Sequence, residues 1–258
     1  MKTYRTTELA RSIGIHPNTV RLYEELGLIP KAERKANGYR VFTNFHVEQL
    51  AFARTALQVE VLQNGLRKQA IDIIKTSSEG NFDKAIHLTK RYYQQIKREQ
   101  RNAEEAIVIT EKLLSGENQE LGNAMLTRKE TADLMQISMD SLRNWELNGL
   151  LTVKRKQNGY RVYSDQDIRR LKIIRSLRCA SYSLTAILRM LNALSSDPKV
   201  DIREAIDTPE ETDDIISVCD KLLTSLQYAE NNARVMLTHL GEMKTKFTAS
   251  LTPNRTEE

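Results

Sequence analysis

The sequence predicts a mainly α-helical protein with two winged helix-turn-helix domains, each followed by a long antiparallel coiled-coil helix. Two observations support this fold class. The phrase NGYRVF at residues 37–42 returns as NGYRVY at residues 158–163, and two helical stretches carry apolar residues at alternating spacings of four and three. A repeated phrase indicates a duplicated unit, and a spacing that averages 3.5 residues indicates helices that pair along their length.

The similarity of the two copies extends upstream of the repeated phrase, where the offset changes from 121 to 122. The upstream pairs are Ala10 with Ala132, Arg21 with Arg143, Tyr23 with Trp145, Glu24 with Glu146, Gly27 with Gly149 and Leu28 with Leu150. The one-residue difference falls in a loop, and loop length affects stability little. A duplication with one loop deletion therefore explains both offsets.

Each copy begins with a short predicted helix, at residues 6–13 and 128–135. In the second copy Thr127 and Glu130 have the Thr-x-x-Glu spacing of a capping box. A tight turn follows each helix.

A second helix then runs to Leu26 in the first copy and to Asn148 in the second. In the first copy His16 precedes Pro17, which suits the first position of a helix, and in the second copy Ser138 is the expected cap. The glycines that follow, Gly27 and Gly149, are expected to end these helices.

Short extended segments flank an Asn-Gly pair in each copy, at Asn37-Gly38 and Asn158-Gly159. Asn-Gly tolerates the positive φ angles of tight hairpin turns, so each pair predicts a two-stranded ribbon. A further helix is expected to open at Asn44. The order helix, turn, helix and ribbon is that of a winged helix-turn-helix.

The long helical stretches after each winged unit carry equal seams of 33 residues. The first seam contains Phe82, Ile86, Thr89, Tyr93, Ile96, Gln100, Ala103, Ile107, Thr110 and Leu114. The second contains Ile215, Cys219, Leu222, Leu226, Ala229, Ala233, Met236, Leu240, Met243 and Phe247. A seam of this length requires a partner helix. The partner is either the other long helix of the same chain, which would make a pseudo-dimer, or a helix of a second chain.

These features divide the chain into consecutive segments. We expect a first winged domain at 1–75, a first long helix at 76–115, a linker at 116–125, a second winged domain at 126–195, an acidic connector and second long helix at 196–250, and a tail at 251–258.

Charge is distributed unevenly along the chain. Residues 1–75 carry 12 Lys and Arg against 7 Asp and Glu, and residues 126–192 carry 13 against 6, whereas residues 193–258 carry 7 against 13. The two winged segments are therefore the basic ones. Basic modules attract a polyanion such as nucleic acid.

Several other classes of protein are not supported by the sequence. No apolar run approaches the roughly 18 to 20 residues of a membrane span, so we expect a soluble, cytoplasmic protein. Cys179 and Cys219 lie far apart and the four histidines lack ligand spacing, so no metal or cofactor is expected. We find no nucleotide loop, paired carboxylates or nucleophile with a base, and expect no enzymatic activity.

The segments TVRLYEELGLIP and NGYRVF in the first copy, and SLRNWELNGLL and NGYRVYSDQDIRRLKIIRSLR in the second, resemble the DNA-binding domain of the MerR family of bacterial transcription regulators. The resemblance covers each winged unit. It implies that the chain distorts promoter DNA for RNA polymerase, that it is associated with a bacterial nucleoid, and that its long helices pair in antiparallel fashion. The second copy departs from the pattern at Thr152, which replaces Pro30, at Trp145, which replaces Tyr23, and at Asp140.

Base edges in the major groove are read by side chains early in each second helix. The candidates are Asn18, Thr19, Arg21, Asp140, Ser141 and Arg143. Phosphates are expected to bind Tyr23, Lys35, Tyr39, Arg40, Trp145, Lys154, Lys156, Tyr160 and Arg161. The aromatic residues among them also fit a simpler interpretation, in which they pack in the core or on the hairpin. The carboxylate of Asp140 would repel phosphate.

The predicted partner is double-stranded promoter DNA with a near-palindromic sequence, and RNA polymerase is expected at the promoter. A small-molecule effector is left open, with Tyr92, Tyr93 or Tyr228 as contacts between a winged unit and the long helices. The alternatives are an architectural or adaptor DNA-binding protein without transcriptional output, and a helical protein-interaction module. We favour the pseudo-dimer, because the two seams have equal lengths, and a homodimer stays possible. The sequence does not decide the effector.

Overall fold

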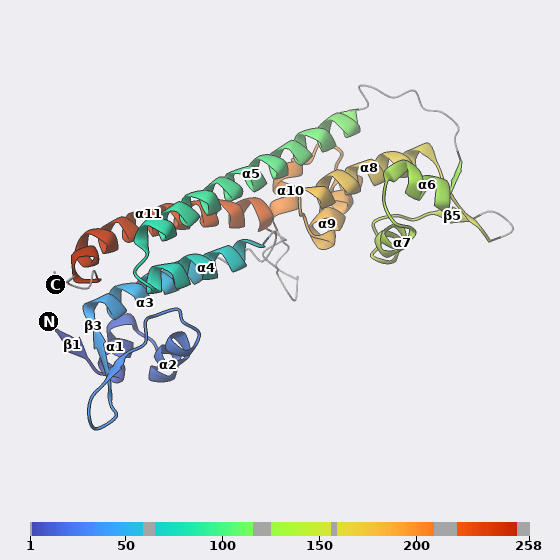
Figure 1. Cartoon of the computed structure of the whole chain (residues 1–258). Coiled ribbons are helices and arrows are strands. Elements are labelled where there is room, and N and C mark those ends of the chain that lie inside the picture. Colours follow the sequence, from blue (N-terminus) through green and yellow to red (C-terminus); the bar gives the residue numbers. More distant parts are fainter. Residues whose placement is uncertain (1, 59–64, 116–124, 156–158, 209–220, 252–258) are drawn as a thin grey trace. The chain divides into compact units, whose positions relative to one another are not determined.

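The computed structural model describes residues 2–58, 65–115, 125–155, 159–208 and 221–251 (Figure 1). The chain forms two compact units. The first contains residues 1–97 and 227–258, and the second contains residues 98–226. None of the described helices is long and apolar enough to cross a membrane. The fold is mainly α-helical, with two winged helix-turn-helix regions, and this confirms the predicted fold class.

The winged part of the first unit has three strands and three helices in close alternation. They are β1 (Thr3–Tyr4), α1 (Thr6–Ile13), α2 (Pro17–Glu25), β2 (Glu33–Arg34), β3 (Arg40–Thr43) and α3 (Asn44–Leu57). The sheet is antiparallel with the order β1-β3-β2. Leu9, Val20, Phe42 and Leu50 are fully buried and form its core.

The second unit repeats this arrangement. Its elements are β4 (Leu126–Thr127), α6 (Arg128–Met135), α7 (Met139–Leu147), β5 (Lys154–Arg155), β6 (Arg161–Tyr163) and α8 (Asp165–Cys179). The sheet order is β4-β6-β5. Tyr4 pairs with Phe42 in the first unit, and Leu126 pairs with Tyr163 in the second. The two registers agree with the alignment of the sequence copies.

Local capping explains where these helices begin and end. The Thr127 side chain accepts from the backbone of Glu130, whose carboxylate accepts from the backbone of Thr127 at 2.8 Å, as the capping box predicted. Pro17 opens α2 and Ser138 caps α7. Each second helix ends one residue earlier than expected, because the chain turns at Gly27 and Gly149, which have φ angles of 70° and 78°.

The third strand of each sheet was not predicted from the sequence. β1 and β4 have two residues each, and so short a segment gives no alternating pattern. Each of them brings the start of the first helix next to the wing.

Two helices follow the wing in the first unit: α4 (Leu66–Ser78) and α5 (Phe82–Ser115). The expected domain boundary placed the long helix from residue 76. It starts at Phe82, because Gly80 has a φ angle of 77°, which no helix can continue through. The Asn81 side chain then caps the new helix by accepting from the backbone N–H of Lys84.

The last long helix, α11 (Leu222–Leu251), runs antiparallel to α5 within the first unit. Near one end of the pair Lys244 contacts Asp83, and farther along Glu230 accepts hydrogen bonds from Tyr93 Oη at 3.2 Å and Lys97 Nζ at 3.3 Å. Figure 1 shows the two helices side by side. Long antiparallel coiled-coil helices were predicted, and the structure contains them.

The predicted seams agree with burial to different degrees. All eight described seam residues of α11, from Leu222 to Phe247, are buried. Ile215 and Cys219 lie outside the described residues. In α5 the prediction was partly wrong, because Leu114 is 40% exposed, and Ala85 and Tyr92 are buried where their seam neighbours Ile86 and Tyr93 are only half-buried. Ala106 is buried in addition to the seam residue Ile107. α5 also packs on α4, with Gln69 bonded to Gln95, so its buried face is wider than one seam.

The second unit also contains α9 (Leu184–Ser196) and α10 (Ile202–Asp207). Tyr182, just before α9, is fully buried and its hydroxyl donates to the Ala103 carbonyl of α5 at 3.4 Å. Asp207 at the end of α10 accepts from the backbone N–H groups of Leu223 and Thr224, at 2.9 and 3.1 Å, and so caps the start of α11. The second winged part is thereby packed against the latter part of α5.

Candidate nucleic-acid interface

Helix α2 presents polar side chains on its exposed face. Asn18 and Arg21 are exposed, and Arg21 Nη1 donates to Asn18 Oδ1 at 3.0 Å. Thr19 is half-buried. His16 accepts from the backbone N–H of Asn18 at 3.2 Å, so the start of the helix is held by its cap. Two of the three base-reading candidates of the first unit are therefore accessible and joined to each other.

Helix α7 is the corresponding helix of the second unit, and its charge differs. Asp140 and Arg143 are exposed, whereas Ser141 is half-buried and its backbone N–H donates to Ser138 Oγ at 3.0 Å. Met139 is 53% exposed beside them. The second helix thus presents one carboxylate, one guanidinium and an apolar side chain, where the first presents an amide and a guanidinium.

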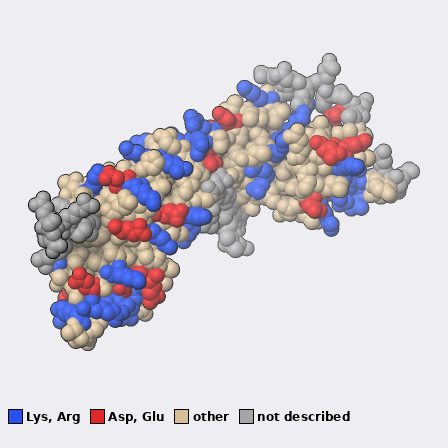
Figure 2. All heavy atoms as spheres, in the orientation of Figure 1, with Lys and Arg blue, Asp and Glu red and all other residues tan. Residues whose placement is uncertain are grey.

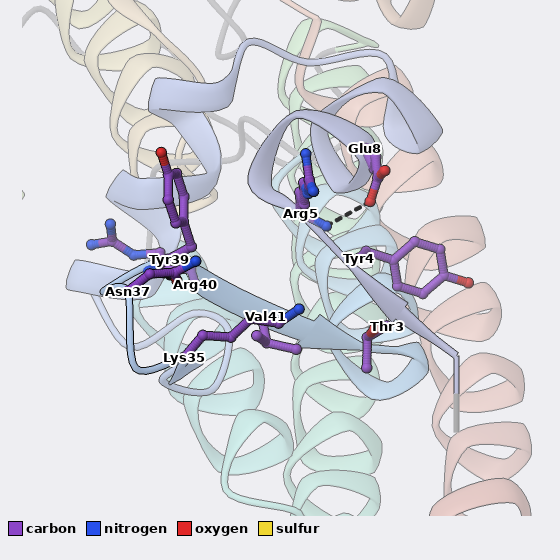
Figure 3. A pocket seen from close by; sticks show the side chains of 9 residues that line it. All are labelled: Thr3, Tyr4, Arg5, Glu8, Lys35, Asn37, Tyr39, Arg40 and Val41. Carbon is purple, nitrogen blue, oxygen red and sulfur yellow. Dashed lines mark hydrogen bonds between the residues drawn. The ribbon is translucent and has the colours of Figure 1, made fainter.

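A groove of about 450 Å³ lies between the wing and the start of α1 (Figure 3). Arg5, Lys35, Tyr39 and Arg40 line it together with Glu8, whose carboxylate accepts from the backbone N–H of Arg5 at 2.7 Å. Cationic side chains outnumber the one carboxylate, and that carboxylate is already engaged in the helix cap. The groove is therefore suited to an anionic group.

A second groove occupies the matching place in the second unit. Arg128, Lys129, Tyr160 and Arg161 line it. In both units the wing supplies a Tyr-Arg pair, and the tyrosines are 70% and 72% exposed at Tyr39 and Tyr160. The two grooves therefore share the Tyr-Arg pair of the wing at duplicated positions, and differ in the residues that line their N-terminal sides.

Each wing arginine is held by a glutamate of the second helix. Arg40 Nε contacts Glu24 Oε2 at 2.6 Å, and Glu24 Oε1 accepts from the backbone N–H of Ala32 at 3.0 Å. Charge-assisted hydrogen bonds of this length fix the orientation of a guanidinium. The wing and α2 are in this way joined by a side-chain contact as well as by the chain.

The second unit has a larger version of this contact. Glu146 receives Arg161 Nε at 2.6 Å, Arg128 Nη2 at 3.1 Å and the hydroxyl of Tyr163. Burial raises the pKa of Tyr163 to about 12, with the hydrogen bond to Glu146 as the next cause. Tyr163 therefore stays a hydrogen-bond donor at neutral pH.

The other phosphate candidates differ in accessibility. Lys35 and Lys154 are exposed, and Tyr23 is half-buried and packs against the core of the first unit. Trp145 is only 6% exposed, so it lies in the core, as the packing interpretation expects. Lys156 lies outside the described residues, as does Asn158.

Sequence reasoning missed Arg5, Arg128 and Lys129, which line the grooves from the N-terminal side. Arg5 is the N-cap residue of α1, and Arg128 and Lys129 follow Thr127, the N-cap residue of α6. The capping signal at Thr127 was read only for its effect on the helix. Figure 2 shows Lys and Arg side chains gathered on the winged part of the first unit, at lower left, in the region of β3 and α2. Charge next to a cap and a wing is the signal that would have identified them.

Among the residues that the structure describes, no three His, Cys, Asp or Glu side chains are grouped as metal ligands. Of the aromatic residues considered for an effector, Tyr92 is buried, Tyr93 donates to Glu230, and Tyr228 is 71% exposed.

Comparison with known families finds two matches in separate parts of the chain. The profile described as MerR family regulatory protein matches residues 5–42, and the profile described as MerR HTH family regulatory protein matches residues 126–194. Each match covers the wing of one unit and the second helix of its helix-turn-helix, α2 or α7, which is the candidate reader helix.

Curated relatives are similar over parts of the chain. The mercuric resistance operon regulatory protein of Bacillus cereus is 37% identical over 65 residues, which are 25% of this chain and 49% of the relative. The HTH-type transcriptional regulator CueR of Salmonella typhi is 38% identical over 94 residues, which are 33% of this chain and 68% of the relative. A probable heavy metal-dependent transcriptional regulator of Haemophilus influenzae is 38% identical over 76 residues, 29% of this chain and 59% of the relative. The chain thus spans about half of the first of these relatives, and no solved structure matches it.

Proposed function

Because the chain belongs to the MerR family of regulatory proteins, we propose that it regulates transcription by binding one promoter site with both of its winged units. Its relatives are DNA-binding transcription regulators. The proposal adds that the site is an imperfect palindrome, because α2 and α7 present different side chains. The observation that carries it is the duplication of reader helix, wing and basic groove within one polypeptide.

In this proposal α2 and α7 enter successive major grooves. Asn18 and Arg21 read one half of the site, and Asp140 and Arg143 read the other, with Thr19 and Ser141 next to them. An amide reads adenine and a guanidinium reads guanine by paired hydrogen bonds, whereas a carboxylate accepts from cytosine. The two halves are therefore expected to differ at the base facing Asn18 and Asp140.

The wings hold the phosphate backbone in this proposal. Tyr39 and Tyr160 present exposed hydroxyls, and Lys35 and Lys154 add positive charge. Arg40 and Arg161 use Nε for their glutamates, so the other guanidinium N–H groups are directed to phosphate. Lys156 completes the proposed phosphate set, whereas Tyr23 and Trp145 pack inside their units and are assigned to packing. Phosphate contacts fix the register of a protein on DNA and make its affinity fall with salt.

We further propose that one chain acts as an intramolecular pseudo-dimer. The antiparallel contacts of α5 with α11 in the first unit support this arrangement, because they join helices from the two sequence copies. Light scattering of the purified protein tests it. A single chain per particle is expected at micromolar concentration, and a dimer that persists on dilution would contradict it.

The output proposed is distortion of the promoter so that RNA polymerase engages both of its elements. In this proposal the paired long helices hold the two winged units at a fixed separation, and the DNA adopts a shape that fits it. Selection of bound fragments from a random DNA pool tests the paired site: two dissimilar half-sites at a fixed spacing are expected. Run-off transcription from the selected site then separates a regulator from an architectural DNA-binding protein, which would leave transcript yield unchanged.

A further inference from the structure

A groove of about 460 Å³ lies in the second unit between the end of α5, the start of α8 and α9. Leu114, Ile173 and Leu194 supply apolar lining, and Gln166, Arg169 and Arg170 supply polar lining. Its volume falls in the range of small-molecule sites. The groove is distinct from the two wing grooves, because it lies where the second winged part meets the end of α5.

The first unit contains an aromatic cluster at the corresponding place. The offset of 121 pairs Phe45 with Gln166, and the ends of the two seams pair Phe247 with Leu114. Phe45 packs against Phe247 with ring centroids 5.2 Å apart, and against Phe82 at 5.9 Å. Two rings in the first unit are thus replaced by an amide and a smaller aliphatic side chain in the second. The groove exists where those rings would lie.

The charges at the two places also differ. In the first unit Glu48 of α3 contacts His239 Nε2 at 3.1 Å and Lys246 Nζ at 3.0 Å, so α3 and α11 are joined by a hydrogen bond to His239 and by an ion pair with Lys246. The residue that corresponds to Glu48 is Arg169. Aligning the seams pairs His239 with Ala106 and Lys246 with Leu113, which are apolar. In the second unit α8 therefore carries a positive charge at Arg169, where α3 carries the negative charge of Glu48. Ala106 and Leu113 of α5 supply no counterion for it.

Arg170 adds a second cation to this groove. It corresponds to Gln49, and both donate to the same carbonyl of their unit: Gln49 Nε2 to Leu28 at 2.9 Å and Arg170 Nε to Leu150 at 2.6 Å. Burial lowers the pKa of the Arg170 guanidinium, and the charge of Asp167 opposes this only in part.

No carboxylate in the described chain forms an ion pair with Arg169 or Arg170. Asp167, the nearest acidic residue in the lining, accepts from the backbone N–H and the hydroxyl of Ser164 at 2.8 and 2.7 Å. A partly buried guanidinium without a bonded carboxylate favours an incoming anion, because charge-assisted bonds to it are strong.

We propose that this groove binds an amphipathic organic anion, a carboxylate attached to an apolar body of about seven carbon atoms. The carboxylate bonds Arg169 and Arg170, and the apolar body occupies the space that Phe45 and Phe247 fill in the first unit. Binding itself stands independently of DNA recognition. Its consequence, that the ligand fixes the winged part against the end of α5 and so alters promoter binding, rests on the proposed function.

The test uses the full chain and octanoate as the probe, with 1-octanol as an uncharged probe of the same length. Equilibrium dialysis measures both. Octanoate is expected to bind saturably, with at least about tenfold higher affinity than octanol, because only the carboxylate engages the arginines. Equal affinity for the two probes, or no saturable octanoate binding, would overturn the proposal. Neither result bears on DNA binding, which is measured separately by fluorescence anisotropy.

Variants locate the bound probe. Arg169→Gln is expected to weaken octanoate binding about tenfold or more, whereas Arg175→Gln, on the same helix and bonded to Gln136 outside the groove, leaves it unchanged. The double variant Gln166→Phe, Leu114→Phe restores the two rings of the first unit and is expected to abolish binding while the melting temperature stays the same or rises. Octanoate binding that survives in both Arg169→Gln and the double variant would contradict this location.

Discussion

Two glutamates at equivalent positions hold different numbers of partners. Glu24 binds one arginine of the wing and a backbone N–H, whereas Glu146 binds Arg161, Arg128 and the hydroxyl of Tyr163. The extra partners arise because Arg128 stands at the first position of α6, facing the wing. Removing the charge of Glu146 therefore leaves two partly buried cations without their partner, whereas removing that of Glu24 leaves one.

We therefore expect Glu146→Gln to destabilise the second unit by about 2 kcal/mol, less than the ~3–5 kcal/mol of a fully buried pair because both arginines are partly exposed. Trp145 is the only tryptophan of the chain and lies in the core of this unit, so its fluorescence in urea reports on the second unit. The matched change Glu24→Gln is expected to destabilise the first unit by about 1 kcal/mol, measured by circular dichroism. Equal losses from the two changes would count against the argument.

His46 gives the first unit a dependence on mildly acidic pH. Its side chain is buried, its Nδ1 accepts from the backbone N–H of Thr43 at 3.1 Å, and its Nε2 has no hydrogen-bond partner in the described chain. Burial lowers the pKa of His46 below 6.5, and the opposing effects of the Lys31 backbone and the Glu24 charge are smaller. The unfolded chain thus binds a proton at a pH where the folded chain does not.

The sign follows from this difference. The stability that the neutral His46 contributes is fully present above pH 6.5 and is lost as pH falls from there through the folded pKa. Urea unfolding followed by circular dichroism from about pH 8 to pH 5 is expected to show this loss. His46→Gln, which keeps an acceptor for Thr43, should remove it, and His87→Gln, an exposed histidine, should not.

Glu48 acts in the same direction at lower pH. Burial alone would raise its pKa, but hydrogen bonds from Lys246 and His239 bring it below 4.5. Its contribution is therefore present above pH 4.5 and is lost below it. A loss in the His46→Gln variant that begins near pH 6.5 would show that another group causes the mildly acidic transition.

At the scale of elements, α11 shows how a heptad seam becomes a buried face. Met236 lies on the seam and is fully buried, and its neighbour Val235 points outward with 54% of its surface exposed. Adjacent residues of one helix therefore test the same substitution in opposite environments. We expect Met236→Lys to destabilise the first unit by about 3 kcal/mol or more, because a buried ammonium lacks a partner there.

Val235→Lys is expected to change the unfolding free energy by no more than about 0.5 kcal/mol, as for exposed sites in general. Urea unfolding followed by circular dichroism measures both variants under the same conditions. Similar losses in the two would mean that the outer face of α11 is covered in solution, as in a dimer of chains.

Elements with a single local cause were predictable from the sequence. Pro17, Ser138 and Gly149 set helix ends through their own conformations, and the seam of α11 appears in the sequence because one face of that helix is buried. The burial of α5 was predicted less well because it packs on α4 as well as on α11. A single periodicity does not describe a helix with two neighbours.

The candidate site followed the same rule. Asn18 and Arg21 lie on the exposed face of α2, as the helical periodicity predicts. The wing grooves, in contrast, combine residues from β1 or β4, the first helix and the wing, which are distant in sequence. Arg5 and Lys129 could be assigned only after the third strand was known. The contacts of Arg40 and Arg161 with glutamates could not be predicted either, since separations of 16 and 15 residues along the chain have no periodic signature.

At the scale of the whole molecule, two basic winged segments in one chain distinguish single-chain from two-chain recognition. In a pseudo-dimer the two halves of the DNA site are bound by different winged units, so a substitution in one unit affects one half. In a homodimer the same substitution is present in both chains and affects the binding of both halves. The proposed pairing of α5 with α11 within one chain therefore predicts that a substitution in one winged unit affects only one half-site.

Arg21→Ala and Arg143→Ala are each expected to weaken binding to the selected duplex by about 10- to 100-fold, the effect of one lost guanidinium contact to a base. If the half-site read by α2 is scrambled, Arg21→Ala should cause no further loss, while Arg143→Ala still should, because distant contacts contribute independently. Fluorescence anisotropy measures all combinations, with Arg98→Ala on the exposed side of α5 as the control. Saturation at one chain per duplex is expected. Two chains per duplex, or a scrambled half-site that makes both variants insensitive, would contradict recognition by a single chain.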